Sequence, residues 1–269
     1  MVKKLFLTLF FLLLVSAAFG ADESSSKTTP SESEVGVEEK LGMIIPEGIY
    51  FYNTKGEKVE IKKLVSQKPT VIAPVYYKCT NVCNILQSKL TNILPQVKLN
   101  PGKDYQVLSV SFDHTETPAI AANEKKNYMA ALPEKFGDKS WKFLTGDKKN
   151  IDKLMNTIGF NFKKRPNSDM FIHPVALILV STEGKIVRYL YGTRLLPFDL
   201  TMAIIEAQKG NIGVSVKRVL SYCFDYDPKG RTYVFNVMRV SGTIIIIFIV
   251  ITFLIIAFGG QKKRRKRDR

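Results

Sequence analysis

The sequence predicts an α/β protein built as a three-layer sandwich, plus one C-terminal transmembrane helix. Three apolar runs with the pattern of buried strands, at residues 70–75, 105–112 and 174–180, alternate with helix patterns. Strands that alternate with helices are typical of a sheet covered on both faces. The apolar, uncharged run 240–260 is about long enough to cross a bilayer. It is expected to be a helix, because an isolated strand in lipid leaves its backbone unpaired.

Both ends of the chain carry targeting patterns. Residues 1–20 combine Lys3 and Lys4, an apolar stretch and small residues, which predicts a secretory signal peptide cut after Gly20. An uncleaved signal anchor is the alternative. The basic tail 261–269 follows the apolar run directly, and the positive-inside rule places it in the cytoplasm. We therefore expect a single-pass protein of the cell membrane, with its main domain on the exported (periplasmic or extracytoplasmic) side.

Charge and cysteine content narrow the class of protein further. The formal net charge is +16, but seven of the 40 Lys and Arg residues lie within 262–269. No basic stripe interleaved with aromatic residues stands out, so no nucleic-acid partner is expected. Three cysteines are too few for a disulfide-stapled scaffold. The main domain is therefore expected to depend on an apolar core.

The elements follow in order between the two ends. Residues 21–40 contain few apolar groups and predict a flexible linker, 41–210 predict one folded domain, and 211–239 predict a juxtamembrane connector. The domain opens with a predicted β-hairpin at 49–61, around a glycine turn. The remaining expected elements are helices at 84–94, 116–132, 148–158 and 197–208, and a hairpin that joins 174–180 to 186–191.

Two thiols lie where the first core strand passes into the first helix. Cys79 and Cys83 have three residues between them, which places them on one face of a helical turn. The start of a helix favours thiolates, because its N–H groups are unpaired and carry partial positive charge. The pair is suited to a soft metal ion or to a redox-active disulfide, and the residues alone leave both open. Two buried core cysteines are a third alternative.

A thiol pair after the first core strand, followed by a closing hairpin, is the layout of a thioredoxin-like domain. In such a sheet the loop before the hairpin faces the start of the thiol helix, and His173 lies in that loop. Two thiolates and one imidazole suit Cu(I), or Cu(II) with an added ligand. Zinc accepts the same ligands but normally takes a fourth. A polar loop histidine with no metal is the alternative interpretation of His173.

The loop after the strand 105–112 carries two further candidates. Asp113 has three open roles, which are to orient a ligand, to contact a partner or to cap the following helix. His114 is expected at the surface. The third thiol, Cys223, lies far from the pair in sequence, and its role is open.

These motifs resemble the Sco/SenC family of thioredoxin-like copper proteins. The resemblance covers about residues 49–208 and rests on Tyr-x-x-Cys-x-x-x-Cys at 76–83, Ser-Phe-Asp at 111–113 with Thr-Pro following, and one histidine before an apolar strand. It implies that Cys79, Cys83 and His173 bind copper, and that Asp113 is the acidic residue of the strand-end loop.

The chain also departs from the family pattern. The strand-end loop lacks the Pro and Arg often found there, Lys78 and Asn84 replace residues that are commonly His or Pro, and the membrane helix is C-terminal. The copper ligand set survives these differences.

The resemblance implies an exported metallochaperone that assists assembly of the copper site of cytochrome c oxidase. Its partners would be the copper-accepting oxidase subunit, a thiol reductant, and the membrane through the C-terminal helix. The alternative is an enzyme, a thiol–disulfide oxidoreductase that reduces the partner's cysteines, with Cys79 and Cys83 as its catalytic redox pair. Replacement of His173 discriminates the two, because only metal binding depends on the imidazole.

Overall fold

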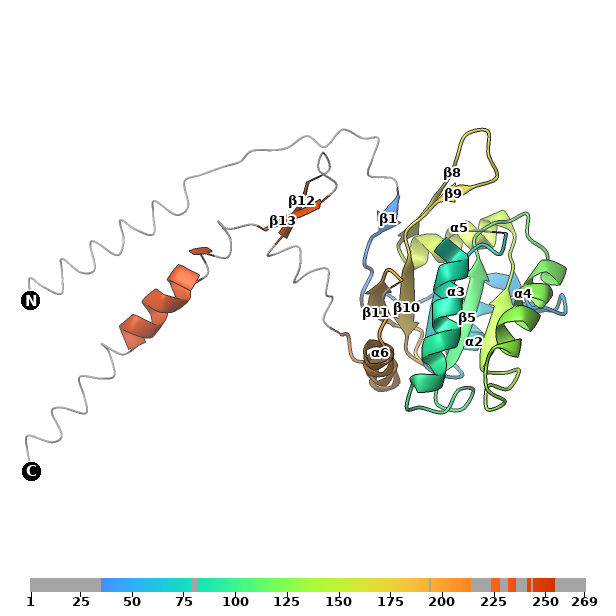
Figure 1. Ribbon diagram of the computed structural model, residues 1–269, viewed down its shortest axis with the longest axis horizontal. Coiled ribbons are helices and arrows are strands. Elements are labelled where there is room, and N and C mark those ends of the chain that lie inside the picture. The colour runs from blue at the N-terminus through green and yellow to red at the C-terminus, as the bar shows by residue number, and fades with distance from the viewer. Residues whose placement is uncertain are drawn as a thin grey trace, which may run out of the picture. The chain divides into compact units, whose positions relative to one another are not determined.

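The computed structural model describes residues 35–78, 82–193, 195–213, 224–227, 232–235, 241–242 and 244–254. The part from residue 35 to residue 213 contains a central sheet and the helices that cover it (Figure 1). Further along the chain, β12 (Phe224–Asp227) and β13 (Thr232–Phe235) pair as a separate antiparallel hairpin.

The central sheet has five strands, in the order β11, β10, β4, β5, β6. Their bounds are β4 Thr70–Val75, β5 Gln106–Ser111, β6 Trp141–Leu144, β10 Ala176–Val180 and β11 Ile186–Tyr191. β4, β5 and β6 run parallel, whereas β10 is antiparallel to β4 and β11 is antiparallel to β10. Every residue of β4, β5 and β10 is buried, as expected for strands covered on both faces.

Helices lie on both sides of this sheet. α3 (Val82–Ile93) follows β4, α4 (Pro118–Ala130) follows β5, and the two helices contact each other. Right-handed crossovers between successive parallel strands place both on the same face. Figure 1 shows α3 and α4 in front of the sheet and α5 (Lys148–Thr157) behind it. α6 (Pro197–Lys209) packs on β11, β10 and β4.

Short elements complete the domain. They are β1 (Gly36–Val37) paired with β7 (Phe160–Asn161), β2 (Tyr50–Tyr52) paired with β3 (Lys58–Glu60), β8 (Lys163–Lys164) paired with β9 (Phe171–Ile172), the helix α2 (Ile61–Val65) and the 3₁₀ turn η1 (Leu94–Gln96). The β2–β3 pair confirms the predicted first hairpin. A backbone bridge between Tyr52 and Thr145 attaches this hairpin beside β6.

The structure confirms the predicted α/β sandwich and its closing hairpin, but it contains a strand that the sequence did not predict. We expected two consecutive helices after the strand 105–112, whereas β6 lies between α4 and α5. β6 has only four residues, and Lys142 interrupts its apolar pattern. A run this short and mixed gives no clear strand periodicity.

The predicted terminal segments are described only in part. The signal peptide 1–20 and the tail 261–269 lie outside the described residues, and residues 244–254 of the predicted membrane helix are helical. No helix within the described ranges has both the length and the apolar character needed to cross a bilayer. Gly36 and Val37, at the end of the predicted linker 21–40, pair with β7, so the ordered domain includes residues before 41.

Candidate metal centre

The end of β4 is the point where the strand order of the sheet reverses. From β4 the chain moves through β5 to β6 on one side, and later returns to β10 on the other side. The carboxyl ends of strands at such a switch point form a crevice that open α/β sheets use for binding. The segment Tyr76 to Cys83 leaves β4 at this point and enters α3. The described residues on either side of the predicted thiol pair, Lys78 and Val82, therefore lie at the edge of the sheet where a binding site is expected.

The helix α3 that follows β4 contains one of the two cysteines of the predicted pair. The helix begins at Val82, earlier than predicted, and so includes Cys83 in its first turn. Cys79 lies outside the described residues, as does the side chain of Cys83. The first turn of a helix is a general setting for thiol chemistry, because its N–H groups are unpaired and the helix dipole is positive there.

His173 approaches the same edge from the other side of β4. β10 pairs antiparallel with β4 through Ile178 opposite Ile72, and continuing this register toward the start of β10 places His173 opposite Tyr77. The imidazole packs against aromatic rings, with centroid distances of 5.8 Å to Tyr76 and 5.1 Å to Phe112. His173 therefore lies beside Tyr76 in the segment that leads from β4 toward the predicted thiol pair.

A hydrogen bond of the His173 ring determines which tautomer of the imidazole is present. Nδ1 of His173 lies 2.8 Å from the carbonyl oxygen of Pro174. A carbonyl oxygen only accepts, so Nδ1 carries the proton and the lone pair is on Nε2. An imidazole whose N–H is held by a carbonyl, with its other nitrogen basic, is the usual state of a metal-binding histidine.

Glu116 holds the segment just before Cys79. Its carboxylate accepts the backbone N–H of Tyr77 at 2.9 Å and that of Lys78 at 2.7 Å, and it accepts the hydroxyl of Ser111 at 2.6 Å. Glu116 is only 5 % exposed. Burial raises the pKa of the Glu116 carboxyl, while the three donated hydrogen bonds act in the opposite direction. These hydrogen bonds therefore connect the loop after β5 to the loop after β4.

Asp113 stabilises its own turn and does not cap α4. Its Oδ1 accepts the backbone N–H of Thr115 at 2.9 Å and the hydroxyl of the same residue at 2.8 Å. The residue before α4 is Thr117, whose position carries no side-chain cap bond. Asp113 is buried and lies next to the Glu116 loop, whereas His114 is exposed, as predicted. Cys223 lies outside the described residues.

The donor set that the sequence predicts is only partly described. Within the described part of the chain no three His, Cys, Asp or Glu side chains cluster as metal ligands do. Two of the three predicted donors, the sulfurs of Cys79 and Cys83, are not in that part. The third, His173, is described, and the contact of its Nδ1 with the Pro174 carbonyl leaves Nε2 as the nitrogen for a metal ion. The chemistry of the predicted donors thus fits copper.

Sequence reasoning missed Glu116 and the aromatic wall behind His173. We expected a helix over 116–132, opened by Thr117-Pro118, but α4 begins at Pro118 and leaves Glu116 in the loop. Thr117-Pro118 already indicated this start, because proline at the first helical position places Glu116 before the helix. The ring centroid of Phe112 lies 5.6 Å from that of Phe160 and 4.7 Å from that of Phe162. These residues are far apart in the sequence, so no local pattern predicts that their rings pack together.

The strand order, the thiol loop at the switch point and the closing hairpin define a thioredoxin-like protein with a cysteine–histidine candidate site. Comparison with known proteins specifies the family. The SCO1/SenC family model matches residues 48–206, which is more than half of the chain. The chain belongs to the SCO1/SenC family. One similar structure is that of BsSco, described as a member of the Sco family of cytochrome c oxidase assembly proteins.

Individual proteins are similar to this chain. The SCO1 protein homolog of Bacillus subtilis (strain 168) is 24% identical over 152 residues, which cover 55% of this chain and 75% of the relative. A putative electron transfer protein of Aquifex aeolicus VF5 is similar in structure, with a TM-score of 0.56 and 27% identity over 64% of this chain and 95% of that one. Arabidopsis thaliana ScoI, solved with copper bound, has a TM-score of 0.51 and 20% identity, and the match covers 62% of this chain and 99% of that one.

Proposed function

We propose that this chain is an exported, membrane-tethered metallochaperone that assists copper-site assembly in a respiratory cytochrome oxidase. The family supports this proposal, since its members include Arabidopsis ScoI with bound copper and BsSco, a cytochrome c oxidase assembly protein. The observation that carries it is the position of His173. The imidazole lies at the edge of the sheet where β4 leads to Cys79, in a tautomer suited to metal binding.

Copper is the cargo in this proposal, with Cys79, Cys83 and His173 as its ligands. Two thiolates and one imidazole leave copper three-coordinate, as Cu(I) or, with an added ligand, as Cu(II). An open coordination position lets a donor from the oxidase subunit bind before a resident ligand leaves. The same ligands that hold copper thus permit its transfer.

The thiols also explain the need for a reductant. Oxidation of Cys79 and Cys83 to a disulfide would remove both thiolate ligands, and an exported compartment favours this oxidation. A thiol reductant that supplies two electrons and two protons would restore the pair. We include such a reductant among the partners.

The tether follows from the ends of the chain. The apolar run 240–260 is proposed as the single membrane helix, with the signal 1–20 exporting the domain and the basic tail 261–269 remaining in the cytoplasm. This arrangement would hold the domain close to the membrane in which the oxidase is assembled.

An anaerobic copper titration of the reduced full-length chain in detergent tests the proposal. We expect one Cu(I) per chain, with competition by a chelator to report affinity. His173→Ala should weaken copper binding by about 100-fold or more, because loss of a residue that only orients a ligand already costs about 10- to 100-fold. His114→Ala is the matched control, since it removes the exposed histidine, and it should leave the affinity unchanged.

The same variants separate the chaperone from the oxidoreductase. Disulfide exchange needs both thiols but no imidazole ligand, so His173→Ala should exchange with a dithiol at nearly the wild-type rate. If His173→Ala bound copper as tightly as His114→Ala, the metallochaperone proposal would lose its main support. Fast dithiol turnover by the wild type in that case would favour the oxidoreductase.

A further inference from the structure

A lysine-lined pocket lies against the edge strand β6, near the first residues of β4 and β5. Its volume is about 590 Å³, which is within the range of small-molecule sites. The residues around it are Asn53, Thr54, Lys55, Glu57, Val59, Leu64, Gln67, Lys68, Lys125, Asp138, Lys139, Lys142, Phe143 and Leu144. None of them belongs to the candidate metal centre, which lies where β4 and β5 end.

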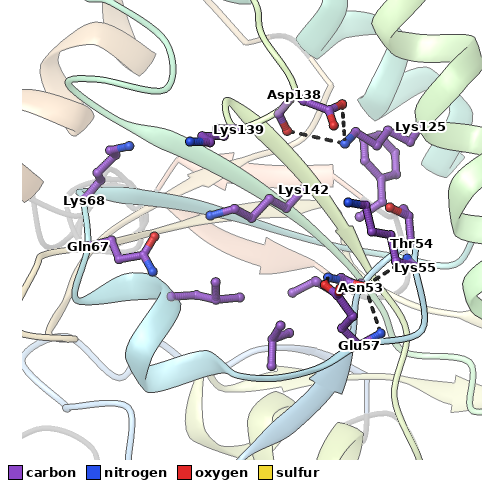
Figure 2. A pocket seen from close by; sticks show the side chains of 14 residues that line it. Asn53, Thr54, Lys55, Glu57, Gln67, Lys68, Lys125, Asp138, Lys139 and Lys142 are labelled. Atoms are coloured by element: carbon purple, nitrogen blue, oxygen red, sulfur yellow. Dashed lines mark hydrogen bonds and ion pairs between the residues drawn. The ribbon is translucent and has the colours of Figure 1, made fainter.

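Positive charge is in excess in this pocket. Five lysines line it, against the two acidic residues Glu57 and Asp138. Asp138 is engaged by Lys125 at 2.7 Å, and Glu57 accepts the amide of Asn53 at 2.8 Å. Figure 2 shows these two pairs at one end of the pocket. Lys68, Lys139 and Lys142 lie toward the opposite end. The two acidic groups thus do not neutralise the positive charges of Lys68, Lys139 and Lys142.

Lys142 is held in the pocket by a buried partner. Its ammonium donates to Oε1 of Gln106 at 2.6 Å. Gln106 is 1 % exposed and is fixed through its own amide, which donates to the carbonyl of Leu64 at 2.6 Å and to the hydroxyl of Thr70 at 3.0 Å. This network positions the ammonium before any ligand arrives, which distinguishes the site from a set of mobile surface lysines.

Folding places this ammonium in an unfavourable environment. Burial lowers the pKa of Lys142, and the nearby charges of Lys68, Lys125 and Lys139 lower it further. The chain therefore pays a cost to gather like charges around a half-buried one. An anion in the pocket would offset this cost.

We propose that this pocket binds a soluble polyanion with two or more phosphate groups. Lysines from the segment before β4 (Lys68), from the segment before β6 (Lys139) and from β6 (Lys142) line it, and phosphate oxygens accept charge-assisted hydrogen bonds from ammonium groups. No arginine is among the lining residues. Recognition therefore depends on the charge of the ligand and not on the bidentate hydrogen bonds that a planar guanidinium group would make. The apolar residues of the floor, such as Phe143 and Leu144, are buried, which leaves little surface for an acyl chain.

Titration of the full-length chain in detergent with inorganic pyrophosphate tests the proposal. We expect one binding event by calorimetry and a rise in the melting temperature, because the ligand binds only the folded state. Affinity should increase from phosphate to pyrophosphate to tripolyphosphate, and should fall with ionic strength. A short-chain phosphatidic acid should bind no more tightly than glycerol 3-phosphate, because both present one phosphate and the pocket has no site for the chains.

Paired variants decide whether the pocket is responsible. The double variant Lys68→Gln/Lys142→Gln should weaken pyrophosphate binding by about tenfold or more. Lys89→Gln/Lys98→Gln is the matched control, since it removes the same charge from exposed positions outside the pocket, and it should change affinity by less than about twofold. Equal loss in both double variants, or no binding to the wild type at low salt, would overturn the proposal. Copper affinity should be the same in all these variants, so the result does not depend on the metal centre.

Discussion

The carboxylate of Glu116 accepts the backbone N–H of Lys78 at 2.7 Å, directly before Cys79 in the sequence. The same carboxylate accepts the N–H of Tyr77 at 2.9 Å. Two consecutive N–H groups that emerge from β4 are thus paired with one side chain from the loop after β5. Since a buried donor without a partner is costly, this pairing fixes the path along which the chain approaches its first thiol.

Replacement of Glu116 by Ala should therefore weaken copper binding without removing a ligand. We expect a loss of about tenfold, at the lower end of the effect of residues that orient metal ligands. Glu116→Gln keeps one acceptor oxygen and should lie between Glu116→Ala and the wild type. Chelator competition with the reduced full-length chain measures the effect. Glu134→Ala, at an exposed position, is the control, and equal affinity of both Ala variants would show that Glu116 has no positioning role.

The parts of this architecture that the sequence predicts are those with local periodicity. The continuous apolar runs of β4, β5 and β10 indicate buried strands, and Asp147 and Gly159 mark the ends of α5. β6 was missed because Lys142 interrupts it, and this lysine is tolerated only because β6 is an edge strand beside a polar pocket. That reason exists only in three dimensions.

The candidate site also has features that the sequence predicts and features that only the structure shows. His173 could be placed from sequence because antiparallel pairing of its strand with β4 brings the start of one to the end of the other. The role of Glu116 could not, because it acts through backbone groups 38 and 39 residues away. The lysine pocket likewise joins Lys68 to Lys142, which are close only once β4, β5 and β6 have paired.

The hydroxyl of Tyr77 should contribute measurably to stability. It accepts the backbone N–H of Leu144 at 3.0 Å and lies 2.9 Å from the carbonyl oxygen of Ser109, in a buried setting. Tyr77→Phe leaves the Leu144 donor without this acceptor and should cost about 1–3 kcal/mol. Urea denaturation measures the change in the free energy of unfolding.

Tyr105→Phe is the matched control for this experiment. Tyr105 is also fully buried, but its hydroxyl has no hydrogen-bond partner among the described residues. Removal of an unpaired buried hydroxyl should be neutral or stabilising. A larger loss in Tyr105→Phe than in Tyr77→Phe would contradict the hydrogen-bond assignment.

Gly159 should tolerate no side chain. Its φ of +65° is in the left-handed region, and a Cβ at this position would lie 1.8 Å from the carbonyl oxygen of Glu38. The two backbones are joined there, since the N–H of Glu38 donates to the carbonyl of Gly159 at 2.9 Å. Gly159→Ala should displace β1 from β7 and cost about 3 kcal/mol or more. Gly56→Ala has a similar φ of +78° with nothing within 4 Å, and should cost only about 1–2 kcal/mol. Equal melting temperatures of the two variants would show that the contact with Glu38 is unimportant.

The N-terminus of α5 gives a prediction about pH. Oδ1 of Asp147 accepts the backbone N–H of Asn150 at 2.9 Å, and Oδ2 accepts its side-chain amide at 2.8 Å. These hydrogen bonds, that from the backbone first, lower the pKa of Asp147. A carboxyl whose pKa is lower in the folded state contributes stability above its unfolded pKa of about 4, and loses it as the pH falls through the folded value.

Asp147→Ala should therefore lower the free energy of unfolding by about 1 kcal/mol at pH 7, and its difference from the wild type should shrink below about pH 4. Asp147→Asn is the informative control, because asparagine caps helices equally well but does not ionise. It should match the wild type at pH 7 and show less dependence on pH in the acidic range. Urea denaturation of the three proteins between pH 7 and pH 3 measures both effects. A constant difference between Asp147→Ala and the wild type over this range would show that the charge of Asp147 does not contribute to the cap.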